Sequence, residues 1–372
     1  MAAQRYHFLL VAPSLEKKGG VSDFCKMLMN HLSPDFETVH FAVGSQTGKE
    51  NLGSRLIAFI RNTGRLLALL RGRKFNLIQI NPSLTRDALI RESVHLCLLN
   101  ALHMAKRTVV FFHGWDRRLA ERIRKNPLWR EAFVRIYSKP ALIFVLCRTF
   151  QEQMIQLGLN PEKIKITTTM YERGEDCGKP SELEDTKNGR VQILFMSRFL
   201  KEKGVFVSAE VGRLLAVSGR RDFKMVLAGD GEESEKLRHY ILENGLSGHI
   251  SAPGFISGRM KKNHLAESDI FLFPTFYNEG CPVVVLEAMG AGLAIVSTPV
   301  GAIADIVKPN ENGFLISSRD PRDFCEAVDR LIEDRELLRK IQRVNRKMAQ
   351  ENFEAGVVTG NLESVYRSIL HA

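Results

Sequence analysis

The feature that most constrains the fold is a regular alternation of short apolar runs with longer amphipathic stretches along almost the whole chain. Apolar runs of about four to eight residues are typical of buried parallel strands, and the stretches between them are typical of covering helices. In the first half the predicted strands are His7–Ala12, Thr38–Val43, Leu77–Ile80, Thr108–Phe112, Ala141–Leu146 and Ile164–Thr168. In the second half they are Val191–Met196, Phe223–Ala228, Ile250–Pro253, Ile270–Phe273, Ala294–Ser297 and Gly313–Ile316. The pattern predicts an α/β protein with parallel sheets.

The length of the chain and one polar segment indicate that this pattern belongs to two domains. The chain has 372 residues, more than the ~250–300 at which a single core stops growing. Residues 172–190 are polar and aperiodic, which is typical of an interdomain linker. We expect two Rossmann-like, doubly wound domains facing a cleft, with ligands at the carboxyl ends of the strands. The tail Leu337–Leu370 is predicted to be helical, with breaks near Gly356 and Gly360.

The net charge is uneven along the chain. It is +11 overall, with 53 Lys and Arg against 42 Asp and Glu. Residues 1–180 hold 28 of these bases and 15 of the acids, so the whole excess lies in the first half. A basic surface indicates an anionic partner such as a phosphorylated ligand, a membrane or nucleic acid.

The cysteines and the apolar runs of the sequence indicate the cellular compartment. Six scattered cysteines without a C-x-x-C pair are typical of reduced thiols. The start of the chain lacks the basic region and long apolar stretch of a signal peptide, and no run is long enough to cross a membrane. We therefore expect a cytoplasmic protein whose contact with the inner face of a membrane would be peripheral.

The segment from Asn278 to Gly292, NEGCPVVVLEAMGAG, is the strongest local signal. A loop ends at Glu279-Gly280, and Pro282 is placed to begin a helix that the later glycines end. Free backbone N–H groups and the helix dipole make such a helix start a site for anions and hydroxyl groups. Glu287, in an otherwise apolar run, requires a polar partner. The segment predicts a binding site for a phosphorylated or hydroxyl-rich ligand.

This segment resembles the E-x7-E motif of the family 4 retaining glycosyltransferases, which have the GT-B architecture and are also described as glycosyl transferases group 1. Other segments are similar to the family's motifs in the same order along nearly the whole chain. They are Lys18–Val21 (a G-G loop), Phe112–Gly114 (an H-G motif), Ser197–Gly204 (R-x-x-x-x-K-G), Ala228–Gly231, Pro253–Phe255 and Phe273–Thr275. Ser197 stands where the family more often has Gly, and Cys281-Pro282 replaces a frequent aromatic-Gly pair.

The resemblance implies three parts. They are an acceptor-binding domain over residues 1–175, a domain for the nucleotide-sugar donor over 176–345, and a C-terminal helix over 346–372 that returns to the first domain. Arg198 and Lys203 would neutralise the donor diphosphate, and Glu287 would accept hydrogen bonds from the ribose hydroxyls. The donor-binding residues are expected to be Gly19, Gly20, Arg198, Lys203, Gly280, Cys281, Pro282, Val283 and Glu287.

The resemblance also implies retaining transfer, by attack of the acceptor on the face of the sugar that the nucleotide leaves. His113 and Glu279 are the expected catalytic residues, both acting at the transferred sugar. No D-x-D motif follows a predicted strand, so we expect neither a metal nor another cofactor. The expected function is transfer of a hexose-type sugar to a glycan or lipid-linked acceptor, in the biosynthesis of a surface polysaccharide, lipopolysaccharide or other glycolipid.

Two basic stretches of the first half, Arg55–Lys74 and Arg117–Arg135, favour an anionic or lipid-linked acceptor. The first has cations beside an apolar helical stripe, as helices lying on anionic membranes do. The more common explanation for such a pattern is a helix packed on a sheet with its cations in water. Two other functions remain open: a GT-B epimerase or hydrolase of nucleotide sugars, and a basic protein that binds nucleic acid without catalysis. The second has no reader motif to support it, and we expect no nucleic-acid partner.

Overall fold

The computed structural model describes residues 5–17, 19–44, 52–173 and 189–371. Contacts divide the chain into two compact units. The first comprises Met1–Met170, Asn278–Cys281 and Ala355–Ala372, and the second comprises Tyr171–Tyr277 and Pro282–Glu354. Each unit contains one six-stranded parallel sheet, which confirms the predicted α/β fold with two Rossmann-like domains. The linker predicted over residues 172–190 lies largely outside the described residues.

The sheet of the first unit has the strand order β2-β1-β3-β5-β7-β8 and is parallel throughout. Its strands are β1 (Tyr6–Ala12), β2 (Phe36–Ala42), β3 (Leu77–Ile80), β5 (Thr108–Phe111), β7 (Leu142–Val145) and β8 (Ile164–Ile166). Every side chain of β3, β5 and β7 is buried, because a parallel sheet is covered by helices on both faces.

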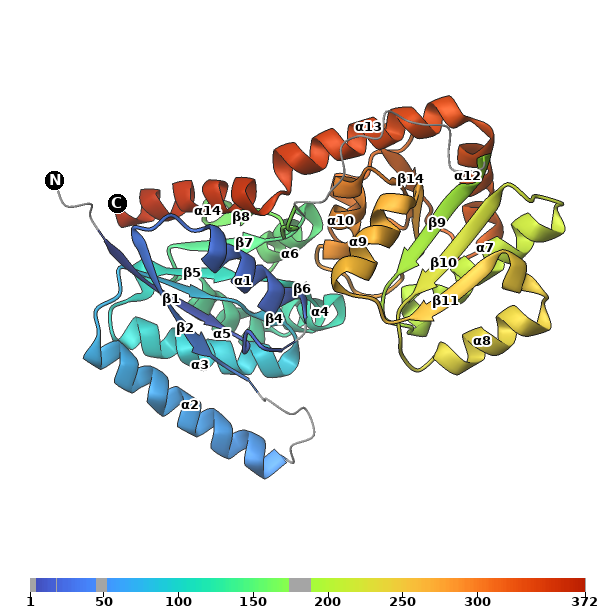
Figure 1. The fold of residues 1–372 in the computed structure, drawn as a ribbon. Helices are drawn as coiled ribbons and strands as arrows, with labels where there is room; N and C mark the ends of the chain where they lie inside the picture. Colours follow the sequence, from blue (N-terminus) through green and yellow to red (C-terminus); the bar gives the residue numbers. More distant parts are fainter. Residues whose placement is uncertain (1–4, 18, 45–51, 174–188, 372) are drawn as a thin grey trace. The chain divides into compact units, whose positions relative to one another are not determined.

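Two groups of helices cover this sheet on opposite faces (Figure 1). On one face α1 (Gly20–His31) packs against α14 (Ala355–Leu370). On the other, α3 (Arg86–Ala101) packs against both α2 (Leu52–Gly72) and α5 (Pro127–Tyr137). Tyr366 of α14 is fully buried, with its ring centroid 5.5 Å from that of Phe8. The C-terminal helix therefore completes the core of the first unit, as the predicted fold class requires.

Sequence patterns missed a small feature after β5. The short strands β4 (Ser83–Leu84) and β6 (Gly114–Trp115) pair in parallel and tie the loops that follow β3 and β5 together. The helix α4 (Arg117–Lys125) begins immediately afterwards, with the Asp116 carboxylate accepting hydrogen bonds from two backbone N–H groups of its first turn. The helix α6 (Arg148–Gln156) follows β7.

The sheet of the second unit has the order β11-β10-β9-β12-β13-β14. Its strands are β9 (Val191–Met196), β10 (Phe223–Ala228), β11 (Ile250–Gly254), β12 (Ile270–Phe273), β13 (Ala294–Ser297) and β14 (Gly313–Leu315). Four of the six match the predicted bounds residue for residue. The helices of this unit are α7 (Val205–Val217), α8 (Ser234–Glu243), α9 (Gly258–Glu267), α10 (Val283–Ala291), α11 (Ile303–Ile306), α12 (Pro321–Glu333) and α13 (Arg335–Asn352).

Two details of the predicted helices are wrong. The C-terminal helical region is interrupted between α13 and α14, at residues 353 and 354, whereas Gly356 and Gly360 both lie within α14. The interruption has a tertiary cause, because Tyr171 forms a β-bridge with Glu354 and its N–H donates to the Phe353 carbonyl. Pro282 precedes α10 as its N-cap instead of being its first helical residue.

Within the described residues, no helix has both the length and the apolar character that crossing a bilayer requires.

Candidate active site

The ends of β9 and β10 in the second unit are pressed closely together. A Cβ atom on Gly229 would lie 1.8 Å from the Ser197 carbonyl oxygen, and Gly229 has a φ of +154°. Only glycine fits this position, since it combines a backbone conformation that side chains disfavour with a close backbone approach. The turn thereby holds the segment that begins at Ser197 and carries Arg198.

Arg198 and Lys203 are brought together around one aromatic ring. The Nζ atom of Lys203 lies 4.4 Å from the centroid of the Tyr277 ring, and the Cζ atom of Arg198 lies 5.6 Å from it. Lys203 is only 8% exposed, whereas Arg198 is exposed. Both cations lie within the range of favourable cation–π contact. The resemblance implied that both cations bind one diphosphate, but it did not identify Tyr277, which comes from the loop after β12.

Glu287 lies on α10, and its carboxylate meets a lysine that sequence analysis did not single out. The Nζ atom of Lys261, on the neighbouring helix α9, is 2.5 Å from Oε1 of Glu287. Both side chains are partly buried, with 30% of the Lys261 side chain and 17% of the Glu287 side chain exposed. A carboxylate in an apolar helix requires such a partner, which is the signal that could have prompted a search for a cation. Glu287, the residue expected to bind the ribose, is thus paired with the ammonium group of Lys261.

The loop before α10 belongs to the first unit. A Cβ atom on Gly280 would lie 2.3 Å from the His113 carbonyl oxygen, so only glycine can approach the loop after β5 this closely. Asn278 donates from its side-chain amide to the Trp115 carbonyl. Thr169 Oγ1 donates to the Cys281 carbonyl at 3.2 Å. Glu279 lies between these contacts and is buried. The segment therefore brings Glu279 and Gly280 close to the loop that carries His113.

Burial raises the pKa of the Cys281 thiol, which keeps it protonated. A protonated, buried thiol is a poor nucleophile. Cys281 therefore contributes its backbone and its packing.

His113 is a neutral side chain with a defined tautomer. Burial lowers its pKa to about 3. Its Nε2 lies 3.0 Å from Oδ1 of Asn81, which also accepts from the Gln79 amide, while Asn81 Nδ2 donates to the Val11 carbonyl. Because Oδ1 is an acceptor, Nε2 carries the proton and Nδ1 is an acceptor. Nδ1 is buried and has no hydrogen-bond partner among the described residues.

This network continues to the C-terminal helix. The Tyr366 hydroxyl on α14 donates to the side-chain carbonyl of Gln79. Fully connected buried networks fix the orientation of their members. The orientation of the His113 ring thus depends on residues far along the chain, none of which a local motif identifies.

Gly19 and Gly20 lie at the end of the loop after β1, where Gly19 caps α1. Both are exposed, and a Cβ atom at either would meet nothing within 4 Å. The structure leaves room for a ligand at this helix start and imposes no packing reason for the glycine pair.

Across the described ranges, no three His, Cys, Asp or Glu side chains gather in a way that could hold a metal ion.

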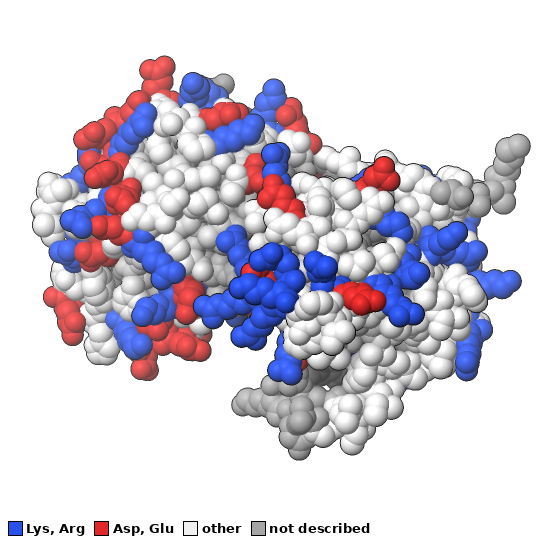
Figure 2. Space-filling model, turned by 180° about the vertical axis from the view of Figure 1, so that it is seen from behind, with Lys and Arg blue, Asp and Glu red and all other residues white. Residues whose placement is uncertain are grey.

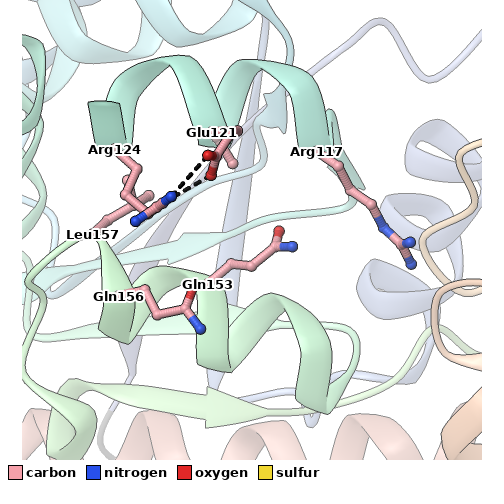
Figure 3. A pocket seen from close by; sticks show the side chains of 7 residues that line it. Arg117, Glu121, Arg124, Gln153, Gln156 and Leu157 are labelled. Atoms are coloured by element: carbon pink, nitrogen blue, oxygen red, sulfur yellow. Dashed lines mark hydrogen bonds and ion pairs between the residues drawn. The ribbon is translucent and has the colours of Figure 1, made fainter. Parts of the chain in front are cut away.

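A groove in the first unit lies between α4 and α6 (Figure 3). It is lined by Arg117, Ala120, Glu121, Arg124, Gln153, Gln156 and Leu157. Arg124 holds Glu121 through two hydrogen bonds of 2.8 Å and lowers the pKa of that carboxyl to about 2. Gln153 accepts from the indole N–H of Trp115. The groove is polar, and Gln153 connects it to the loop that carries His113.

A family model matches the second part of the chain. Residues 181–348 match the model described as "Glycosyl transferases group 1". The matched range includes Arg198, Lys203, Glu279 and Glu287.

Curated proteins are similar over a larger range. The chain is 28% identical over 233 residues to "Amylovoran biosynthesis glycosyltransferase AmsK" of Erwinia amylovora, which covers 60% of this chain and 55% of the relative. It is 23% identical over 269 residues to "Putative colanic acid biosynthesis glycosyltransferase WcaL" of Escherichia coli K12, covering 71% and 64% respectively. The matched part of this chain thus spans less than two thirds of the length of these relatives.

Solved structures share the fold. The structure of Anabaena Alr3699/HepE in complex with UDP and glucose superposes with a TM-score of 0.71 at 17% identity, covering 98% of this chain and 100% of that one. A glycosyltransferase from Rickettsia africae superposes with a TM-score of 0.75 at 16% identity, covering 99% of each chain.

Proposed function

We propose that this chain is a retaining glycosyltransferase using a nucleotide-diphosphate sugar, a proposal supported by the match of residues 181–348 to the glycosyl transferases group 1 model and by the fold of two Rossmann-like domains. The observation that carries the proposal is the convergence of Arg198 and Lys203 on Tyr277 at the carboxyl ends of β9 and β12. The leaving nucleoside diphosphate gains negative charge as its bond to the sugar breaks. Two fixed cations stabilise that charge most when it is fully developed.

The nucleoside end of the donor is assigned to α10. Glu287 accepts hydrogen bonds from the ribose hydroxyls, and Lys261 holds its carboxylate in position. The start of α10 at Val283 contributes free N–H groups and the positive end of the helix dipole. Similar structures of Anabaena Alr3699/HepE are complexes with UDP and glucose, with UDP and with UDP-glucose, which supports a nucleotide-sugar donor here.

The sugar end of the donor is assigned to the loop after β5 and the loop before α10. Nδ1 of His113 accepts a hydrogen bond from a hydroxyl group of the sugar, because it is a buried acceptor without a partner among the described residues. Glu279 and the N–H groups of Gly280 and Cys281 hold the remaining hydroxyls. Gly19 and Gly20 leave space at the start of α1 for donor phosphate or sugar.

The chemical step follows from these assignments. The bond between the anomeric carbon and the phosphate oxygen breaks, and the acceptor oxygen bonds to the same face of that carbon. The acceptor proton passes to the departing phosphate oxygen, so no protein base is needed. Glu279 binds the sugar and does not form a covalent intermediate. No step requires a metal, because Arg198 and Lys203 carry the charge of the diphosphate.

The acceptor is a glycan or lipid-linked glycan of a surface polysaccharide or glycolipid, at the cytoplasmic face of a membrane. The names of the two similar proteins refer to amylovoran and colanic acid biosynthesis, which supports this class. The polar groove between α4 and α6 supports a hydroxyl-rich acceptor beside the loop of His113.

A thermal-shift screen of nucleotide sugars tests the proposal, with UDP, GDP, ADP and dTDP derivatives of common hexoses. We expect one nucleotide class to raise the melting temperature, and Arg198→Ala to abolish the rise. The matched control is Arg322→Ala, which removes an exposed cation of the same unit. Absence of stabilisation by every donor, or a response unchanged in Arg198→Ala, would refute the proposal. Turnover of the selected donor without acceptor and without glycan product would instead favour a hydrolase or epimerase.

A further inference from the structure

The two halves of α2 differ sharply in what they bury. In the second half Leu66 and Leu70 are buried against the rest of the first unit. In the first half Leu56, Ile57 and Ile60 are 58%, 67% and 62% exposed. Sequence analysis left open whether this amphipathic helix packs on the sheet or faces another surface. The structure shows that buried leucines anchor the second half of the helix, whereas the first half leaves Leu56, Ile57 and Ile60 exposed.

The exposed residues of α2 form one continuous stripe. At about 100° per residue, positions three, four and seven apart lie on one face of a helix. On α2 this face carries Ile57, Ile60, Gly64 and Ala68, bordered by Arg61 and Arg71, all six of them exposed. The stripe therefore combines apolar or small residues at its centre with cations at its edges.

The neighbouring helix α3 has a stripe of the same kind. Ile90, Val94 and Cys97 are exposed and fall at positions i, i+4 and i+7. The two helices are in contact, with the Phe59 and His95 ring centroids 6.2 Å apart. Several large aliphatic side chains exposed on adjacent helices are unusual on a surface that faces only water.

The charge of this surface is mostly positive, although Asp87 is exposed on α3 one turn before Ile90. The sequence of α2 contains four arginines and no acidic residue. Figure 2 shows this side of the first unit: the lower edge, along which α2 runs, is mostly uncharged and is bordered by Lys and Arg, with few Asp or Glu. A second copy of the chain would bring the same cations against one another if this face paired with itself, whereas an anionic lipid surface complements them.

We propose that α2 and α3 form a docking surface for an anionic phospholipid membrane. Leu56, Ile57 and Ile60 enter the boundary between headgroups and acyl chains, and Arg61 and Arg71 lie at the level of the lipid phosphates. The buried second half of α2 transmits this attachment to the body of the first unit. The surface is independent of the donor site, so it stands or falls separately from the proposed activity.

Flotation with vesicles tests the surface. Wild-type protein floats with vesicles containing phosphatidylglycerol and not with pure phosphatidylcholine. The variant Ile57→Ser with Ile60→Ser lowers the partition coefficient about tenfold or more, since it removes most of the inserted apolar area. The matched control, Val217→Ser with Leu242→Ser, changes two equally exposed aliphatic residues of the second unit and leaves flotation unchanged.

Further variants separate shape from charge. Ile57→Leu with Ile60→Leu retains flotation. Arg61→Ala with Arg71→Ala weakens binding to anionic vesicles by about fivefold per cation. The dependence of binding on lipid chain length stays the same as in the wild-type protein. Each variant is checked for an unchanged melting temperature and unchanged stabilisation by nucleoside diphosphate, which shows that neither folding nor the proposed donor site has been affected.

Three outcomes would overturn the proposal. One is flotation that depends on Leu128 and Trp129, exposed apolar residues in the first turn of α5, and not on Ile57 and Ile60. Another is that the wild-type protein does not bind vesicles but forms a dimer in light scattering, and that Ile57→Ser with Ile60→Ser abolishes this dimer. The last is competition of vesicle binding by duplex DNA that is lost in Arg61→Ala with Arg71→Ala, which would assign the cations to nucleic acid.

Discussion

The two units follow the same rule for placing polar residues, although their sheets are wound differently. In the second unit β10 and β11 lie on one side of β9 and β12 lies on the other. Arg198 follows β9 and Tyr277 follows β12. In the first unit β2 and β3 lie on opposite sides of β1, with Gly19 following β1 and Asn81 following β3. In both sheets these residues lie where the strand order reverses, which is where ligands bind in open α/β sheets. His113 follows β5, the next strand beyond β3.

The donor site and α2 differ in how they hold their positive charge. At the donor site Lys203 lies beside the Tyr277 ring. On α2 four arginines lie on a helix without a single acidic residue, whereas other cations of the first unit are paired, as Arg367 is with Asp35. The positive charge of α2 is thus not balanced within its own helix, whereas the charges of the donor site are few and individually placed.

Lys203→Met should produce the largest effect, and it tests the second unit. Loss of one preorganised donor to a developing negative charge typically lowers turnover by about 10²–10³-fold. We expect a loss in kcat/KM of that order, with weaker binding of nucleoside diphosphate by calorimetry. Lys236→Met, which changes an exposed lysine of the same unit, is the control. Equal losses in both variants would remove the distinction between individually placed and surface charges.

Gly280→Ala tests the segment that the second half of the sequence contributes to the first unit. An added Cβ atom would lie 2.3 Å from the His113 carbonyl oxygen, so the loop must move. A displacement of about 1 Å at a reacting centre can lower turnover by about 10²-fold. We expect that loss in kcat, with the dissociation constant of nucleoside diphosphate nearly unchanged. Gly248→Ala, where a Cβ atom meets nothing within 4 Å, serves as the control.

His113 gives the first unit a pH dependence of stability. Its pKa is about 3 in the folded protein, against about 6.5 when unfolded. Because the unfolded chain binds the proton more tightly, stability falls as pH drops from 6.5 towards 3, by about 1.4 kcal/mol per unit. At pH 5 the loss is about 2 kcal/mol. Urea unfolding at pH 7 and pH 5 should show that His113→Gln reduces this loss, and an identical loss in both proteins would contradict the assignment.

Lys261→Met should have the smallest effect and refines the description of the second unit. We expect KM for the donor to rise about tenfold, with kcat unchanged, because the lysine positions Glu287 and does not contact the reacting atoms. The loss should be larger for a ribonucleoside diphosphate than for its 2′-deoxy form, since Glu287 is assigned to the ribose hydroxyls. Lys261→Arg should restore most of the binding. A purely structural lysine would change both nucleotides equally.

Local patterns predicted the strands well, because buried parallel strands are continuous apolar runs whose ends are marked by polar residues and glycines. The bounds of β9, β10, β12 and β13 needed no correction. The break between α13 and α14 was misplaced because a backbone bridge to Tyr171 causes it, and glycine only predicts a break when tertiary contacts do not decide.

The site was predictable where one segment of sequence supplies it. The run from Glu279 to Glu287 indicates a ligand site because its own glycine and proline mark the start of a helix. Lys261, Tyr277 and Asn81 were missed because each acts on a residue from another element, and no periodicity relates the two partners. An isolated buried carboxylate or histidine indicates that a partner exists but does not identify it.

The path of the chain has a consequence for synthesis and for engineering. The first unit is completed only by residues 355–372, which are synthesised after the whole second unit, and it also uses Asn278–Cys281. Until then Phe8 and the face of the sheet that Tyr366 covers lack their partner. The second unit is thus a long insertion near the end of the first. A hybrid that exchanges halves between relatives at the linker must take the C-terminal helix from the same relative as the first half. Otherwise the helix and the first unit come from different proteins, and the side chains in the core between them will not fit.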